Sequence, residues 1–164
     1  MLSSILGALG IVANMLIYQQ KSGKSLLIFK LVSDFLWAAH YFLISANAAA
    51  AIAAINIFRE IVFFYQNKRQ TSNRLWLIFF LVCSLVSAVL TWKNVFSLLP
   101  AAASAISVIS FWRSSPKLSR ALAFPISASM LTYDIGCGSY MGIINEILTL
   151  ISATVGIFRY NKDK

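Results

Sequence analysis

Charged residues are scarce in this sequence, and acidic ones most of all. Among 164 residues, 14 are Lys or Arg and 5 are Asp or Glu, and charged residues make up 12% of the chain against 59% hydrophobic ones. A soluble domain of ordinary composition carries about 25% charged residues. The composition therefore excludes a soluble domain, and we expect an integral membrane protein whose first partner is the lipid bilayer.

Groups that carry catalysis are also scarce, with one histidine, His40, and two cysteines, Cys83 and Cys137. An intramembrane hydrolase needs a nucleophile with its base, an H-E-x-x-H metal motif or paired catalytic aspartates, and the chain contains no such pattern. The cysteines fit no metal-ligand spacing, and a nucleotide motif of the form G-x-x-x-x-G-K-[ST] is missing. We therefore expect no enzyme activity, no metal and no cofactor.

Long apolar runs fill most of the chain, and each is long enough to cross a bilayer as a helix. There are seven of them: residues 2–19, 25–45, 47–65, 75–92, 95–112, 119–135 and 140–159. The ten-residue alternating segments of a membrane β-barrel are missing. The sequence thus predicts an all-α polytopic fold of seven transmembrane helices in a single membrane domain, residues 1–164.

Basic residues, which give a net charge of +9, gather at alternate connections. Those that follow the first, third and fifth helices or end the chain are Lys21, Lys24, Lys68, Arg69, Arg74, Arg113, Lys117, Arg120, Arg159, Lys162 and Lys164. The loop after the fourth helix has only Lys93. Because basic loops stay in the cytoplasm, this pattern predicts the N-terminus outside and the C-terminus inside, and it explains the charge without nucleic acid as a partner.

The chain shows signs of an internal repeat. Residues 1–69 and 95–164 share one order: a helix rich in small residues, a basic loop, a helix with a polar centre, a neutral turn and a helix with a basic end. An offset of 94 residues aligns Tyr18 with Trp112, Ser33 with Ser127 and His40 with Asp134. Each unit has an odd number of spans, three, so a single linking helix in residues 70–94 returns the chain to the starting side of the membrane. Both units then have the same orientation, which predicts a 3+1+3 plan of parallel repeats. The alternative is that the similarity follows from hydrophobicity and topology alone.

Four charged residues lie within the predicted second and third helices. At about 1.5 Å per residue from the neutral turn at 45–47, Asp34 and Arg59 lie about 16 to 18 Å deep, near the bilayer midplane. Lys30 and Glu60 lie slightly deeper. A charge left alone there costs about 2.5 to 3.5 kcal/mol, so we predict structural ion pairs between the helices, Asp34 with Arg59 and Lys30 with Glu60. Lys30 and Asp34 also share a helix face, and Lys30 and Glu60 have the alternative of reaching toward the cytoplasmic surface.

Other polar or aromatic residues of the predicted helices suit a binding site for a small solute. The candidates are His40, Asn56, Asn145, Glu146, Trp37 and Asn14. Asparagine both donates and accepts hydrogen bonds, Glu and His exchange protons or hold a cation, and Trp stacks on rings. The alternative for each is an ordinary contact between packed helices.

The 3+1+3 plan, the outside N-terminus and the small size resemble the MtN3/SWEET and PQ-loop superfamily. The stretches "SDFLWAAHYFLISANAAAAIAAINIFREIVFFYQNKR" and "INEILTLISATVGIFR" resemble the YgjV family of bacterial inner membrane proteins. The superfamily implies passage of a small polar solute through a site between two three-helix units. The chain differs from SWEET-like proteins in lacking a PQ dipeptide and in having helix prolines, Pro100 and Pro125, only in its second half.

These features together predict a facilitator of a small polar metabolite, sugar-like or vitamin-like, in the bacterial inner membrane. A homo-oligomer is compatible with the resemblance. Two alternatives stay open: a membrane scaffold or sensor subunit that transports nothing, and an ion channel. A continuous polar cavity that reaches a membrane face would distinguish a transporter, which needs one, from a scaffold, which does not.

Overall fold

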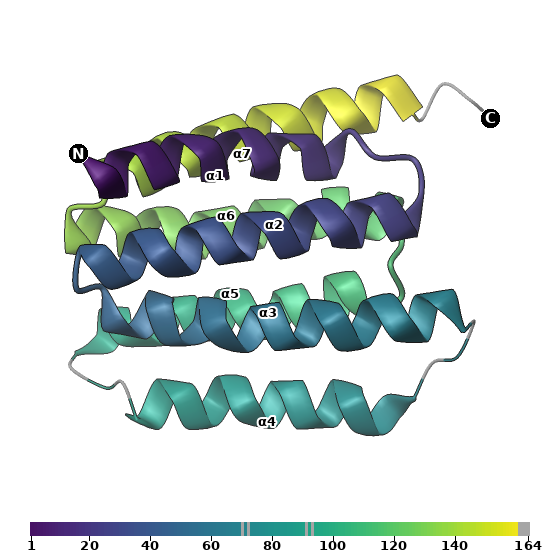
Figure 1. Cartoon of the computed structure of the whole chain (residues 1–164), viewed down its shortest axis with the longest axis horizontal. Coiled ribbons are helices and arrows are strands. Elements are labelled where there is room, and N and C mark those ends of the chain that lie inside the picture. Colours follow the sequence, from purple (N-terminus) through teal and green to yellow (C-terminus); the bar gives the residue numbers. More distant parts are fainter. Residues whose placement is uncertain (70, 72, 91, 93, 161–164) are drawn as a thin grey trace.

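The computed structural model describes residues 1–69, 71, 73–90, 92 and 94–160, so Lys93, Lys162 and Lys164 of the predicted basic pattern lie outside the described residues. The described residues form seven α-helices, as predicted, and one 3-10 turn (Figure 1). They are α1 (Leu2–Tyr18), α2 (Gly23–Leu43), α3 (Asn47–Lys68), α4 (Arg74–Leu90), η1 (Val95–Ser97), α5 (Leu98–Trp112), α6 (Pro116–Cys137) and α7 (Tyr140–Tyr160).

Local chemistry explains several helix ends. The Ser22 hydroxyl accepts a hydrogen bond from the Ser25 amide at 3.1 Å and so caps α2. Pro116 occupies the first turn of α6, three residues before the predicted start, at a position where its missing N–H costs nothing. Gly138 ends α6 with φ 72°, a left-handed conformation that favours glycine.

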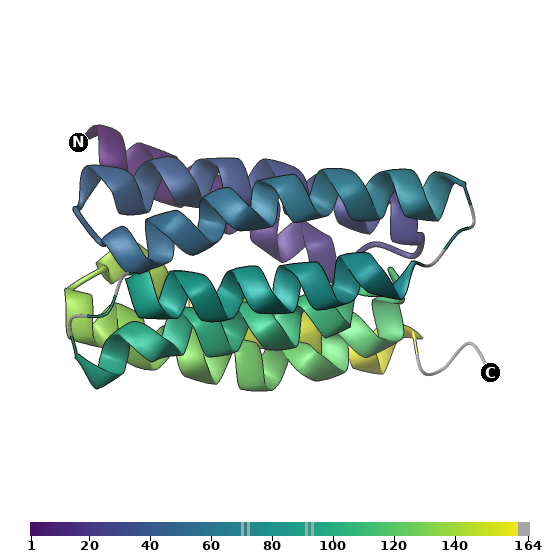
Figure 2. The same cartoon turned by 90° about the horizontal axis from the view of Figure 1, so that it is seen from below.

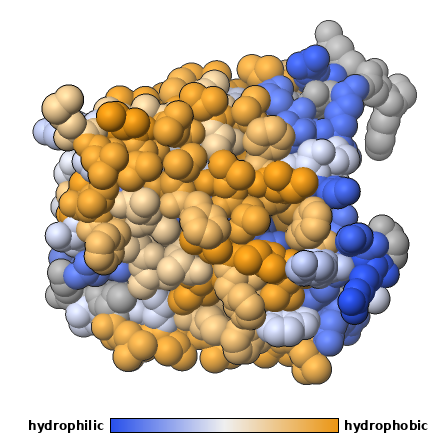
Figure 3. All heavy atoms as spheres, in the orientation of Figure 1, coloured by the Kyte–Doolittle hydropathy of each residue, from blue (hydrophilic) through white to orange (hydrophobic). Residues whose placement is uncertain are grey.

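Four segments are long and apolar enough to span a membrane: Gly23–Leu43, Asn47–Lys68, Val95–Trp112 and Tyr140–Arg159. The helices α1 and α4 are apolar and shorter, with 17 residues each. All seven helices lie along one common direction (Figures 1 and 2). Apolar side chains cover most of the visible face, and hydrophilic ones gather at one end (Figure 3). This distribution suits a bundle whose sides contact lipid.

The helices form two layers of three. One layer is α1, α2, α3 and the other is α7, α6, α5, with α2 and α6 each in the middle of its layer (Figures 1 and 2). The layers contact each other at their edges, where α1 packs on α7 and α3 packs on α5. The remaining helix, α4, packs on α5 and α3 along one side of the bundle.

The two ends of the bundle differ in charge. The end that we call the basic end carries the exposed residues Lys21, Lys24, Lys68, Arg69, Arg74, Arg113, Lys117 and Arg159. The prediction for Arg120 is wrong. It was grouped with the basic loop residues, but it lies within α6 and is buried. The opposite end carries the α2–α3 and α6–α7 turns.

Candidate functional site

A cavity of about 100 Å³, lined by both polar and apolar side chains, lies in the middle of the bundle, between α2 and α6. At about 30 Å³ per water molecule, it has room for a few waters or a small solute. Both layers contribute three helices to its wall, and no described residue of α4 lines it. Its polar lining is Asn14, Lys30, Ser33, Asp34, Asn56, Ser104, Ser107, Ser127, Asn145, Glu146 and Thr149. Its aromatic lining is Tyr18, Trp37, Tyr41 and Phe111.

The edge where α1 meets α7 forms one polar wall of this cavity. Asn14 on α1 donates hydrogen bonds to Asn145 Oδ1 at 3.0 Å and to Thr149 Oγ1 at 2.8 Å, both on α7. The Asn145 amide in turn donates to Glu146 Oε1 at 2.8 Å. Three candidate residues from opposite ends of the chain thus meet, and Glu146 is held at the cavity surface by its neighbour.

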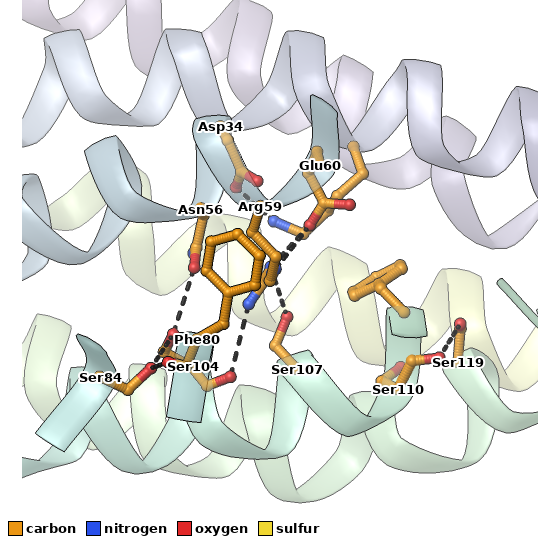
Figure 4. Close-up of polar contacts among 12 residues, drawn as sticks. Asp34, Asn56, Arg59, Glu60, Phe80, Ser84, Ser104, Ser107, Ser110 and Ser119 are labelled. Atoms are coloured by element: carbon orange, nitrogen blue, oxygen red, sulfur yellow. Dashed lines mark hydrogen bonds and ion pairs between the residues drawn. The ribbon is translucent and has the colours of Figure 1, made fainter. Parts of the chain in front are cut away.

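The edge where α3 meets α5 forms the other polar wall (Figure 4). Asn56 Oδ1 accepts a hydrogen bond from the Ser104 hydroxyl at 3.2 Å. That hydroxyl also lies 3.0 Å from the hydroxyl of Ser84 on α4. The serines were not predicted as site residues, because a single hydroxyl in a membrane helix is too common a feature to stand out from packing residues.

The four buried charges do form ion pairs, but with partners other than those predicted. Lys30 pairs with Asp34 one turn along α2. Arg59 folds back onto its own neighbour, with Nη2 2.7 Å and Nε 3.0 Å from Glu60 Oε1, while Nη2 also donates to Ser107 Oγ at 3.0 Å. The predicted pairs between helices, Asp34 with Arg59 and Lys30 with Glu60, are therefore wrong. So is the alternative of reaching for the surface, because Glu60 is 0% exposed and Lys30 13%.

The positions and the reach of the side chains explain why the pairs differ from those predicted. Residues four apart share a helix face, so Lys30 meets Asp34 without leaving α2. The guanidinium of Arg59 is long enough to bond the adjacent carboxylate and α5 at once. The charges of Lys30 and Asp34 also act on the Glu60 carboxylate through space. The two pairs thus form one neutral charge cluster between α2, α3 and α5.

Apolar clusters lie on both sides of the cavity. Toward the basic end, one joins all seven helices through buried residues that include Ile17, Leu26, Phe63, Val108 and Phe111. Toward the opposite end, a second contains residues of the first layer and of α6: Ile11, Trp37, Tyr41, Ala46, Ala48, Ala49 and Tyr133. The cavity therefore lies between two apolar clusters, one toward each end of the bundle.

His40 does not line the cavity, although sequence placed it among the candidates. Its Nδ1 lies 2.8 Å from the Ser3 carbonyl oxygen on α1, and its Nε2 lies 3.1 Å from the hydroxyl of Ser139 in the α6–α7 turn. The Tyr41 hydroxyl, one residue on, donates to Asp134 Oδ1 at 2.8 Å. His40 and Tyr41 thus connect α2 to the second layer at the opposite end.

Arg120 makes the corresponding connection at the basic end. Its Nε donates to the Tyr18 carbonyl at 3.0 Å and its Nη2 to the Gln20 carbonyl at 2.9 Å. These bonds satisfy the carbonyl of Tyr18, the last residue of α1, and that of Gln20 in the α1–α2 loop. Sequence reasoning missed this role because Arg120 follows two exposed basic residues and was grouped with them.

The remaining candidates, Asn14, Trp37, Asn56, Asn145 and Glu146, all line the cavity. Trp37 stands edge-on to His40, with ring centroids 5.1 Å apart, and is tilted against Tyr41 at 5.4 Å. Its ring therefore lies between the cavity and the opposite end of the bundle. Whether these residues bind a solute stays a prediction.

Comparison with known proteins gives a family and no closer relative. The model of the Imp-YgjV family, described as a bacterial inner membrane protein, matches residues 1–164. No curated protein and no solved structure matches the chain. The family description, together with the helices long enough to span a membrane, confirms the predicted location as a multi-pass protein of the inner membrane. The chain belongs to the Imp-YgjV family of bacterial inner membrane proteins.

Proposed function

We propose that this protein is a non-enzymatic facilitator that carries a small polar solute across the inner membrane through the central cavity. The observation that carries the proposal is the cavity itself, lined by three helices of each layer and bounded by apolar clusters on both sides. A scaffold has no need of a polar space inside its core. Filling such a space with apolar side chains stabilises a bundle more than leaving buried polar groups beside it.

The layered arrangement supports the view that residues 1–69 and 95–164 are parallel repeats. A half-turn about an axis along the bundle exchanges α1 with α5, α2 with α6 and α3 with α7, and the members of each pair run in the same direction (Figure 1). The cavity lies where this axis passes between α2 and α6. In transporters built from repeats, the solute binds at the interface of the two units.

The basic end is the cytoplasmic end in this proposal, because positively charged loops stay on that side. The connections at the two ends of the cavity then become the two gates. Tyr41 with Asp134 closes the outer side, and Arg120 with the α1 carbonyls closes the cytoplasmic side. In this proposal, breaking either contact opens the corresponding side of the cavity. No nucleotide motif is present in the sequence, so the solute gradient or protons supply the driving force.

Uptake into liposomes tests the proposal. We expect liposomes that contain the purified protein to take up at least one of labelled glucose, glycerol, ethanolamine and glycolate faster than empty liposomes. Asn56→Ala and Glu146→Ala are expected to slow this uptake. The matched control is Ile147→Ala, since Ile147 adjoins Glu146 on α7 and is 48% exposed on the outer face.

Two results would contradict the proposal. Uptake no faster than in empty liposomes for all four solutes favours the scaffold or sensor. Uptake that both site variants leave unchanged, while their melting temperatures show an intact fold, means that solute passes elsewhere.

A further inference from the structure

The charges that line the cavity do not balance. Its charged lining residues are Lys30, Asp34 and Glu146. Lys30 pairs with Asp34, and the adjacent Arg59–Glu60 pair is neutral in itself. Glu146 forms no ion pair with any of the described residues. The described lining is therefore one positive charge short.

The same surface has an acceptor without a donor. Asp34 is 4% exposed, and its Oδ2 has no hydrogen-bond partner among the described residues. The Lys30 contact uses the other oxygen, Oδ1. Glu146, which is 6% exposed, accepts a hydrogen bond from the Asn145 amide at 2.8 Å and has the Ser127 hydroxyl as a further neighbouring donor. A buried carboxylate without enough donors is costly, so these oxygens favour a ligand that brings both charge and N–H groups.

Aromatic rings complete the surroundings of these carboxylates. Tyr18, Trp37 and Tyr41 line the cavity on the α1 and α2 side. A fourth ring, Phe111, already faces an ammonium group, with Lys30 Nζ 5.6 Å from the ring centroid. Carboxylates combined with aromatic faces are the usual means of binding an organic ammonium group.

We infer that the solute is a small organic cation, with one ammonium group beside a hydroxyl or amide. Glu146 is its counter-ion and Asp34 Oδ2 its second acceptor, while Asn56 and Asn14 face the neutral polar part. The inference rests on the proposed function for its biological meaning, but the binding site stands on the cavity alone. The competing explanation is that a proton neutralises Glu146 and the solute is uncharged.

Three probes of nearly the same shape separate these explanations: ethanolamine is cationic, glycolamide neutral and glycolate anionic. Titration calorimetry of the purified protein in detergent measures their affinities directly. We expect ethanolamine to bind at least tenfold more tightly than glycolamide, and glycolate to show no binding. Ethanolamine is also expected to raise the melting temperature, because it binds the folded state.

Two variants identify the counter-ion. Glu146→Gln keeps the shape and the contact with Asn145 and removes the charge, so the preference for ethanolamine over glycolamide is expected to fall at least tenfold. Ile147→Ala on the outer face of α7 is expected to keep it. The relative affinities of the three probes are measured on the unaltered protein. They therefore test the inference even if Glu146→Gln fails to fold.

The outcomes are distinct. Glycolamide binding as tightly as ethanolamine overturns the inference and supports a protonated Glu146 with an uncharged solute. Failure of all three probes to bind overturns it as well, as does an unchanged preference in a folded Glu146→Gln variant. Ethanolamine binding together with no uptake of any of the four solutes into liposomes leaves the cation site in place and refutes the facilitator. Uptake of glucose or glycerol, combined with no preference for ethanolamine over glycolamide in binding, supports the facilitator and overturns the cation site.

Discussion

Replacement of Arg59 by methionine is expected to destabilise the protein strongly. Arg59 and Glu60 are both 0% exposed, and Arg59 Nη2 and Nε both bond Glu60 Oε1, at 2.7 and 3.0 Å. The Glu60 Oε2 atom has no hydrogen-bond partner among the described residues, so Arg59→Met removes the donors that this carboxylate has. Removing one member of a buried pair costs about 3–5 kcal/mol. The unfolding free energy, measured in mixed micelles by titration with dodecyl sulfate, is expected to fall by that amount.

A double-mutant cycle separates the pair from its surroundings. Glu60→Met is expected to cost less than Arg59→Met, because Arg59 keeps its bond to Ser107 Oγ at 3.0 Å and Asp34 lies in the same charge cluster. The double variant replaces both charges by apolar groups, which for buried pairs is close to neutral. Its loss is therefore expected to be well below the sum of the single losses.

Ile61→Met serves as the control for the cycle, since Ile61 follows the pair on α3 and is 39% exposed. Its unfolding free energy is expected to change by less than about 0.5 kcal/mol, as for other surface substitutions. Losses of Arg59→Met and Glu60→Met that simply add in the double variant would show that the two side chains do not stabilise each other, and the charge cluster would have to be redrawn.

Three further experiments test other contacts. Exchanging the pair on α2, Lys30→Asp with Asp34→Lys, is expected to recover much of the stability that Asp34→Lys alone loses, measured by the same titration; no recovery would refute the ion pair. Gly142→Ala places a methyl group against the Asp134 carboxylate, and overpacking of this kind costs about 1–3 kcal/mol, so a lower melting temperature is expected. Asn14→Leu removes both hydrogen bonds from α1 to α7, at about 0.6–1.7 kcal/mol for each such bond in a membrane, and an unchanged melting temperature would mean that they contribute nothing.

The helices and part of the cavity lining could be predicted from the sequence. Runs of about twenty apolar residues allow few structures other than helices, because backbone groups in lipid must bond within their own segment. Polar side chains in such runs have to face inward for the same reason. This is why Asn56, Asn145 and Glu146, chosen from their place in apolar runs, all line the cavity.

The partners of these residues could not be predicted in the same way. Counting residues from a turn gives depth along a helix, whereas a contact also requires the rotation of each helix about its axis. Asp34 and Arg59 lie at similar depths, yet Asp34 bonds along its own helix and Arg59 bonds back to Glu60. His40 lies outside the cavity lining for a related reason, since its ring faces α1 and the α6–α7 turn rather than the space between α2 and α6.

The distribution of polar contacts between the layers indicates how the cavity would open. Both edges are joined beside the cavity, by Asn14 at one and by Asn56 at the other, so the edges are suited to act as pivots. Across the middle, Tyr41 bonds Asp134 toward the opposite end of the cavity, and Arg120 bonds the Tyr18 carbonyl toward the basic end. A neutral hydrogen bond contributes about 0.5–1.5 kcal/mol net and one to a charged group about 1.5–3 kcal/mol. In the proposed facilitator, opening the basic end would break the Arg120 bonds and separate the apolar cluster around Phe63 and Phe111, and opening the opposite end would break the Tyr41–Asp134 bond, while the layers rock about their edges.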